Sequence, residues 1–389
     1  MGFSKRFVPY GRQYIDEEDI EAVIEVLKSD FITQGPKIKE FESKLARKLD
    51  AKYAVVFSSG TAALHAAYFA AGLQSGDEFI TTPMTFAATS NAGLFLGAKP
   101  IFADIEPDTG NIDATQIEKL ITPKTKLISV VHYAGHPVDL EPVKETADKY
   151  NLKVVEDACH SLGAKYKNTS IGSSKYSDAT VFSFHPVKHI TTGEGGAVLT
   201  NDGEIYEKLL MFRNHGITRD REKFINTPHG DWYYEMQFLA PNYRMTDLQA
   251  ALGISQLKKL DYFVKRRREI AQIYNQTFKG NSYFDLPPEK EYAYHSYHLY
   301  PIRLKSHLWE KKREIFRKLR EEGVGVQIHY IPVYLHPYYQ RLGYQKGICP
   351  KAENFYQAEI SLPIYPAMTD EDIEFVIEKI LKVFKHTGG

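Results

Sequence analysis

The sequence predicts an α/β protein, with a large first domain built on a mostly parallel sheet and a smaller α+β domain at the carboxyl end. Between about residues 53 and 200, seven short apolar runs alternate with helix-like segments. Such alternation is typical of a sheet covered by helices on both faces. The 389 residues exceed the ~250–300 that one hydrophobic core usually holds, so we expect two domains, 1–245 and 246–389.

The first expected element is an amphipathic helix over residues 16–27, with apolar residues at helical spacing and an acidic first turn that suits the helix dipole. The strands of the large domain are expected at the seven apolar runs: YAVVF (53–57), EFITT (78–82), PIFAD (100–104), KLISVV (126–131), KVVED (153–157), ATVFSF (179–184) and GAVLT (196–200). Ligands of parallel sheets bind beyond the carboxyl ends of the strands. Residues that directly follow these runs are therefore candidate site residues.

The order of elements changes after residue 245. The pattern predicts a long helix over 246–274, a strand at 298–304, a helix over 308–322, a strand within 323–333 and a terminal helix from Asp370. This mixed order predicts the smaller α+β domain.

Charge and composition exclude several classes of protein. Lys and Arg number 49 and Asp and Glu also 49, so no overall basic field attracts nucleic acid or anionic lipid. No apolar run approaches the ~20 residues that cross a bilayer. Two cysteines cannot form a multi-disulfide framework, and no charged-then-apolar leader opens the chain. We expect a soluble cytoplasmic protein that binds neither nucleic acid nor membranes, and no metal site.

Lys188 lies in FSFHPVKHITTGEGG (182–196), between a strand-like run and a glycine-rich turn. A lysine amine whose surroundings depress its pKa forms Schiff bases with aldehydes such as pyridoxal 5′-phosphate (PLP). Asp157 ends another apolar run, and a buried carboxylate keeps the ring nitrogen of that cofactor protonated. Each residue alone is also typical of a solvated loop. Together they predict a Schiff-base lysine and its carboxylate partner.

The segment FSSGTAALHAAYFA (57–70) passes from a strand into a helix at Gly60 and Thr61. The first N–H groups of a helix bind phosphate, although the same residues are also a good helix cap. Ser183 precedes Lys188 by five residues and is placed to add another phosphate donor. Phe86 follows a strand-like run and either stacks on a pyridine ring or belongs to the core.

Six segments in the same order resemble the DegT/DnrJ/EryC1/StrS family of PLP-dependent nucleotide-sugar aminotransferases across essentially the whole chain: SSGTAAL, TTPMTFAATSNA, VVEDACHSLGA, FSFHPVKHITTGEGG, LAPNYRMTDLQAALGISQL and HYIPV. The resemblance implies the PLP-dependent transferase fold of type I, which is aspartate aminotransferase-like, with PLP as cofactor. Within the family, the segments FSFHPVKHITTGEGGAVLTND, SDFITQG and IHYIPVY are most similar to enzymes of pseudaminic acid biosynthesis, and spore-coat-type sugar aminotransferases are similar too.

By this resemblance, Lys188 is the Schiff-base lysine and Asp157 the partner of the ring nitrogen. The other expected cofactor contacts are Gly60, Thr61, Phe86, His160 and Ser183, with His160 standing where many relatives carry glutamine. Asn242 would reach the phosphate of a cofactor bound by a partner subunit, which implies a homodimer with shared active sites. The expected sugar contacts are Tyr10, Thr33, Gln34, His185, Ile328, His329, Tyr330 and Ile331.

The resemblance implies transfer of an amino group from L-glutamate to the C4 keto group of a UDP-linked 4-keto-6-deoxy-N-acetylhexosamine. Relatives that dehydrate the sugar carry histidine at the position of Lys188. Because this chain has lysine there, transamination is favoured. Three alternatives stay open: a PLP enzyme of other specificity, a regulator that binds a sugar nucleotide without turnover, and a dinucleotide oxidoreductase. A dinucleotide oxidoreductase is disfavoured because the sequence has no G-x-G-x-x-G at a strand–helix junction. Among other PLP enzymes, a lyase or desulfurase is not indicated by Cys159 or Cys349.

Overall fold

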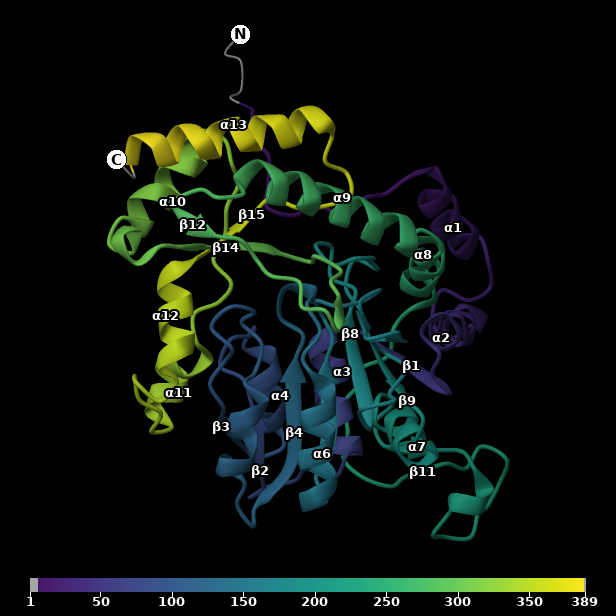
Figure 1. Ribbon diagram of the computed structural model, residues 1–389. Coiled ribbons are helices and arrows are strands. Elements are labelled where there is room, and N and C mark those ends of the chain that lie inside the picture. Colours follow the sequence, from purple (N-terminus) through teal and green to yellow (C-terminus); the bar gives the residue numbers. More distant parts are fainter. Residues whose placement is uncertain (1–5, 388–389) are drawn as a thin grey trace.

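In the computed structural model, which describes residues 6–387, a seven-stranded sheet forms the centre of the molecule (Figure 1). The strand order is β1-β9-β8-β5-β4-β2-β3. Only β9 runs antiparallel to its neighbours. The strands are β1 (Tyr53–Phe57), β2 (Glu78–Thr81), β3 (Lys99–Phe102), β4 (Thr125–Val131), β5 (Lys153–Asp157), β8 (Ala179–Ser183) and β9 (Gly196–Thr200). Each predicted run forms one strand, and the mostly parallel sheet is confirmed.

Both faces of this sheet are buried, because successive side chains of each strand point to opposite faces. Val55 packs with helix α3 (Gly60–Ala70) and α7 (Gly203–Phe212) on one face. Its neighbour Val56 packs on the other face, with α2 (Pro36–Leu49) and α6 (Leu140–Tyr150). The continuous apolar runs of the sequence therefore reflect a sheet between two helical layers.

The other helices, in chain order, are α1 (Glu17–Leu27), α4 (Ala88–Phe95), α5 (Ala114–Ile117), α8 (Asp247–Lys258), α9 (Leu260–Phe278), α10 (Lys312–Glu321), α11 (Pro337–Arg341), α12 (Pro350–Ala358) and α13 (Asp370–Thr387). Of these, α4 packs in the same layer as α3, and α8 packs in the same layer as α2. Single 3-10 turns occupy Glu118–Leu120, Tyr133–Gly135, Arg221–Lys223, Ser306–Leu308 and Val333–Leu335.

Helix α1 begins where the sequence predicts. Asp16 caps it and forms a reciprocal capping box with Asp19. The long helix predicted over 246–274 is instead two helices, since the chain bends at Lys259, where α8 ends and α9 begins. The ammonium group of Lys259 forms ion pairs with both carboxylates of the α1 cap. The bend lets α8 pack on α1 and α2 while α9 continues towards the smaller sheet (Figure 1).

The smaller sheet is antiparallel, in the order β12-β14-β15, and its core includes residues of α9, α10 and α13. Its strands are β12 (Phe284–Asp285), β14 (Tyr300–Leu304) and β15 (Glu359–Leu362). Val8, from the beginning of the chain, lies in the same core. The predicted division at residues 245 and 246 stays a prediction, and side chains of α8 lie in the core of the large sheet.

The strand expected within 323–333 is wrong. That segment makes only isolated bridges, from Val324 to Val8 and from Gln327 to Ser361, and then runs irregularly to Val333. The terminal helix predicted from Asp370 is confirmed as α13.

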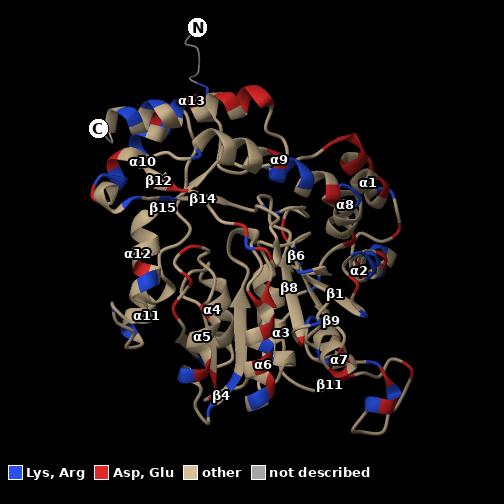
Figure 2. Cartoon of the chain, viewed as in Figure 1, with Lys and Arg blue, Asp and Glu red and all other residues tan. Residues whose placement is uncertain are grey.

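Short strands complete the fold: β6 (Lys165–Tyr166), β7 (Thr169–Ser170) and β13 (Ala293–Tyr294) form one sheet, and β10 (Ile217–Thr218) and β11 (Glu235–Met236) another. Charged residues gather on the outer helices, and the central strands are largely free of them (Figure 2). No helix of residues 6–387 is long and apolar enough to cross a membrane.

Candidate active site

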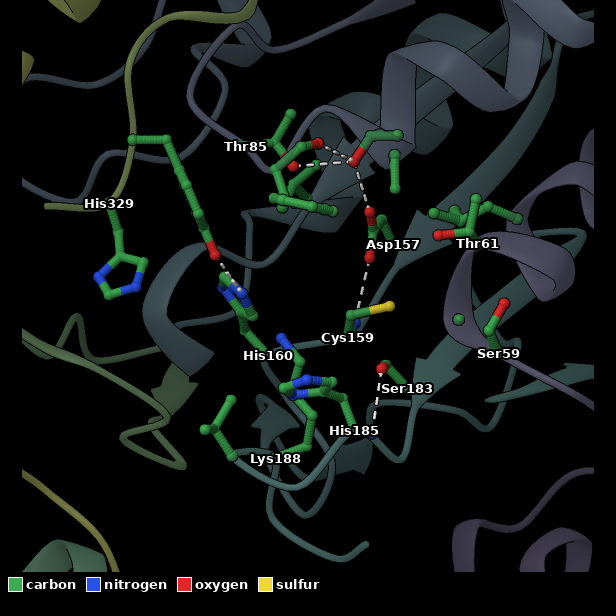
Figure 3. Close-up of a pocket in the computed structure, with 18 of the residues that line it drawn as sticks. Ser59, Thr61, Thr85, Asp157, Cys159, His160, Ser183, His185, Lys188 and His329 are labelled. Carbon is green, nitrogen blue, oxygen red and sulfur yellow. Dashed lines mark hydrogen bonds between the residues drawn. The ribbon is translucent and has the colours of Figure 1, made fainter. Parts of the chain in front are cut away.

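A pocket of about 630 Å³ lies at the carboxyl ends of the parallel strands, and side chains from distant parts of the chain converge on it (Figure 3). Twelve of the sixteen predicted site residues line this pocket: Tyr10, Gly60, Thr61, Phe86, Asp157, His160, Ser183, His185, Lys188, Ile328, His329 and Tyr330. The rule that ligands bind beyond strand ends accounts for this convergence. Among the described residues, no group of three or more His, Cys, Asp or Glu is arranged to hold a metal ion.

Asp157, the last residue of β5, is 4% exposed, and two donors fix its carboxylate. Thr89 Oγ1 donates to Oδ2 at 2.6 Å, and the backbone N–H of Cys159 donates to Oδ1 at 3.2 Å. The hydroxyl of Thr85 lies 2.8 Å from that of Thr89 and extends the network. These hydrogen bonds fix the orientation of the carboxylate in the pocket, where it can pair with a positively charged group of a ligand.

Lys188 projects into the same pocket from the loop between β8 and β9, which we call the lysine loop (residues 184–195). The N–H of Phe184 donates to the carbonyl of Gly195 at 2.8 Å, and the N–H of Thr192 donates to the carbonyl of Phe184 at 3.0 Å. The first of these bonds continues the β8–β9 ladder and closes the loop at its base. Removal from bulk water lowers the pKa of Lys188, although nearby Asp157 opposes the shift. An amine with a depressed pKa is a better nucleophile at neutral pH.

The start of helix α3 forms a cradle for an anion. Ser59 caps the helix by accepting the N–H of Ala62 at 3.1 Å. The N–H groups of Gly60 and Thr61 precede the first intrahelical hydrogen bonds and carry the positive end of the helix dipole. A Cβ atom added at Gly60 would lie 2.8 Å from Cβ of Ser183, so glycine keeps this cradle open. Helix starts of this kind bind phosphate.

Aromatic rings form the remaining cofactor wall. Phe86 is 63% exposed, which agrees with a ligand-facing ring and not with the core alternative. The hydroxyl of Tyr330 lies 3.0 Å from Nε2 of His160. Burial lowers the pKa of His160 well below its usual value, and its Nδ1 atom has no hydrogen-bond partner. The imidazole of His160 is therefore neutral, and only one of its two ring nitrogens has a hydrogen-bond partner. Such a ring at the pocket wall suits a polar group of a bound ligand.

Next to Tyr330, with the two ring centroids 4.9 Å apart, His329 is held by a buried network. The carboxylate of Glu359 accepts the N–H of His329 at 2.8 Å and the hydroxyl of Ser361 at 2.5 Å. Because that hydroxyl hydrogen points to the carboxylate, Nδ1 of His329, 2.9 Å from Ser361 Oγ, donates to the oxygen. Nε2 is then the acceptor. Burial lowers the pKa of His329 to about 3 and raises that of Glu359, although the charge of Lys312 opposes the second shift.

Four predicted residues do not line the pocket: Thr33, Gln34, Asn242 and Ile331. All four are exposed. Thr33 forms a bridge with Thr246, and Asn242 Oδ1 accepts the N–H of Arg244 at 3.3 Å. Their contribution to a site is therefore not made within the subunit's own pocket, and their roles, like those of the other site residues, stay predictions.

Several residues around the pocket were not predicted. Thr89 supports Asp157, and His298 Nε2 lies 3.4 Å from Nζ of Lys188. Ser59 lies within the predicted phosphate-binding stretch, where its hydroxyl was not given a role of its own. Thr89 follows Thr85 by one helical turn within the segment of Phe86, which is a usable signal. His298 lies 110 positions from Lys188, and no local pattern links the two.

The residues present fit PLP. Asp157 matches the protonated ring nitrogen, the start of α3 with Ser183 matches the phosphate, and Phe86 matches a ring face. Lys188 is the amine that the aldehyde requires. No residue of the pocket contradicts this assignment.

Comparisons with known proteins agree with the geometry. The model of the DegT/DnrJ/EryC1/StrS aminotransferase family matches residues 13–381. A UDP-4-amino-4,6-dideoxy-N-acetyl-beta-L-altrosamine transaminase of Campylobacter jejuni is 41% identical over 379 residues, covering 97% of each chain.

Two solved structures share the fold. PseC of Helicobacter pylori, an aminotransferase involved in the biosynthesis of pseudoaminic acid, superposes with a TM-score of 0.91 at 39% identity, covering 98% of this chain and 100% of that one. The PLP form of a sugar aminotransferase of Streptococcus pneumoniae, Spr1654, gives a TM-score of 0.91 at 30% identity and covers 98% and 99%. The type I fold and the PLP cofactor are confirmed. The chain is a PLP-dependent nucleotide-sugar aminotransferase and belongs to the DegT/DnrJ/EryC1/StrS family.

Proposed function

We propose that this aminotransferase moves an amino group from L-glutamate to the C4 keto group of a UDP-linked 4-keto-6-deoxy-N-acetylhexosamine. The observation that carries the proposal is the placement of Lys188, Asp157 and the start of α3 around one pocket. PLP supplies an electron sink when bound there. The protein's part is to orient the donor and sugar carbons and to move one proton at Nζ of Lys188.

The part of the pocket formed by Tyr10, Gln327 and His329, which we call the sugar wall, suits a hexose ligand. Tyr10 lies 5.5 Å from the His329 ring, centroid to centroid, and Gln327 adds an amide beside them. Neutral acceptors and aromatic surfaces of this kind suit a ligand ring that carries several hydroxyl groups. They are less suited to a ligand that carries a second carboxylate. The Campylobacter and Helicobacter relatives carry names that refer to an N-acetylated amino sugar and to pseudaminic acid. We infer that the product enters pseudaminic acid biosynthesis or that of a related bacterial glycan sugar.

We also infer a cytoplasmic homodimer with shared active sites. The pocket contains neither Asn242 nor the pair Thr33 and Gln34, although the family resemblance assigns all three to ligand binding. Exposed apolar side chains adjoin them in the chain: Ile32 is 52% exposed and Leu239 is 87% exposed. Exposed apolar residues of this size favour burial against another protein surface. A second copy would bring these residues to the edge of the first copy's pocket.

The test uses the full-length protein with PLP and follows its visible absorption. L-Glutamate should remove the band of the lysine-bound cofactor, and the UDP-4-keto sugar should restore it in the same sample. GDP-linked and non-acetylated 4-keto sugars serve as matched alternatives. A band that disappears with L-glutamate and returns only with another sugar would show that the proposed substrate is wrong. A band that never forms would contradict the role of Lys188.

A further inference from the structure

Arg267 is a buried cation behind the lysine loop; in the described part of the chain its hydrogen bonds all go to backbone carbonyls, and its Nε has no partner. Its side chain is 1% exposed, and it belongs to helix α9. Nη1 donates to the carbonyls of Ile364 at 2.7 Å, Tyr297 at 3.2 Å and His298 at 3.2 Å, and Nη2 donates to the carbonyl of Val187 at 3.5 Å. Within residues 6–387, no carboxylate forms an ion pair with it. Burying a charge without a counter-ion costs free energy of folding. We therefore expect the charge of Arg267 to have a function.

The carbonyls that Arg267 binds belong to the segments that carry two facing side chains. Val187 precedes Lys188, and His298 supplies both a carbonyl to Arg267 and a ring that faces the amine of Lys188. Nε2 of His298 lies 3.4 Å from Nζ of Lys188. The ring is 4% exposed, and its Nδ1 has no hydrogen-bond partner. Among residues 6–387, the amine is therefore the only hydrogen-bond partner of this imidazole.

We propose that Arg267 and His298 form a buried positioning unit for Lys188. The guanidinium fixes the backbone of residues 187 and 297–298, and the imidazole of His298 holds the amine whenever Lys188 is not joined to the cofactor. Both are positioning residues, because neither replaces the lysine in moving the proton. The inference rests on the aminotransferase reaction and is independent of which sugar receives the amino group.

The charges around Lys188 give this unit a second effect. The groups facing the amine are Asp157 and Cys159, which favour its protonated form; Arg267, which opposes it; and the histidines 160, 189, 298 and 329. Burial lowers the pKa of all four imidazoles, so they are neutral at pH 7. Arg267 keeps its charge at pH 7, although burial lowers its pKa to about 9. It is thus the one fixed cation in this set other than Lys188 itself.

These charges determine the direction in which each substitution shifts the pKa of Lys188. Replacing Arg267 with Leu removes a like charge, so the pKa of Lys188 rises, by about half a unit to one unit. Replacing His298 with Phe removes an acceptor for the ammonium form, so the pKa of Lys188 falls. Arg267→Lys keeps the charge, and His298→Asn keeps an acceptor. Each of these conservative variants should keep the pKa of Lys188 close to its wild-type value.

The first measurement does not depend on turnover. The full-length, cofactor-free protein is treated with cyanate between pH 6 and 11, and carbamylation of Lys188 is followed by mass spectrometry. Its pH midpoint should rise in Arg267→Leu and fall in His298→Phe. Arg268→Leu is the matched control, because Arg268 is the next residue of α9 but pairs with Glu289 at 2.6 Å. It should leave the midpoint unchanged. Should Arg267→Leu fail to fold, the His298 variants still decide the outcome.

The second measurement tests positioning in the holoenzyme. With L-glutamate, His298→Phe should lower the rate of the donor half reaction about tenfold to a hundredfold, with little change in the KM of the donor. α-Deuterated L-glutamate should give a larger isotope effect than in the wild type, because proton transfer becomes the slower step. Unchanged midpoints and an unchanged isotope effect in the folded variants would overturn the inference. If the wild type itself does not react with L-glutamate, the proposed donor is wrong, and the cyanate titration still tests the positioning unit.

Discussion

Replacing Thr89 with Val tests how the pocket holds its carboxylate. The two side chains have nearly the same shape, but Val lacks the hydroxyl that donates to Asp157 Oδ2 at 2.6 Å. The remaining protein donor to this carboxylate is the N–H of Cys159, at 3.2 Å. A methyl group cannot approach an oxygen as closely as 2.6 Å, so the carboxylate must also move. Both effects weaken its pairing with the ring nitrogen of PLP.

The magnitude follows from the type of bond. Loss of a hydrogen bond to a charged group costs ~1.5–3 kcal/mol. The bond to Thr89 exists with and without the cofactor, so only part of this cost appears in the binding free energy. We expect a loss of ~1.4 kcal/mol, which is about a tenfold weaker affinity for PLP.

The assay is a titration of the cofactor-free protein with PLP, followed by absorbance. Thr180→Val is the matched control, because Thr180 is equally buried and donates to the neighbouring carboxylate of Glu156 at 3.1 Å. Glu156 does not line the pocket, so this control should reduce stability without changing the affinity. Equal affinities in Thr89→Val and the wild type would refute the reasoning that the hydroxyl supports Asp157.

Three further predictions concern the lysine, the partner subunit and the sugar wall. Lys188→Ala should abolish amino transfer while circular dichroism shows an intact fold; measurable turnover would contradict its assignment. Asn242→Ala should weaken PLP retention, and mixed dimers with Lys188→Ala should regain one working site; unchanged retention would argue against shared sites. In Glu359→Gln, the new amide donates to Ser361, whose hydroxyl then donates to Nδ1 of His329, so Nε2 changes from acceptor to donor. We expect the KM of the sugar to rise about tenfold with an unchanged L-glutamate half reaction; equal effects on both would show that His329 does not select the sugar.

Much of the large domain could be predicted, because its strands are buried on both faces and therefore read as continuous apolar runs. The same property predicted that Asp157, Gly60 and Ser183 lie near one another, since each ends or follows a strand at the same edge. Features that depend on packing could not be predicted. The bend at Lys259 depends on ion pairs with a helix more than 240 positions away, and no local pattern shows them.

The irregular segment before Val333 was misread for a different reason. Its alternating Val and Ile residues have strand propensity, but packing against the pocket overrides propensity. Ile328 and His329 line the pocket instead of joining a ladder. The contact of Arg267 with the lysine loop is also invisible in the sequence, because the side chain binds carbonyls, which every residue has.

The closed base of the lysine loop has a consequence for the catalytic cycle. With both ends of the loop bonded to each other as an extension of the sheet, the backbone of Lys188 is ordered before any ligand arrives. The entropy of fixing that backbone is lost during folding and does not recur at each turnover. The lysine can leave and rejoin the cofactor by rotating its side chain alone, on a timescale far shorter than a loop closure. The N–H groups of Phe184 and Thr192, which donate across the base of the loop, should exchange hydrogen as slowly as those of the neighbouring strands, in the presence or absence of PLP.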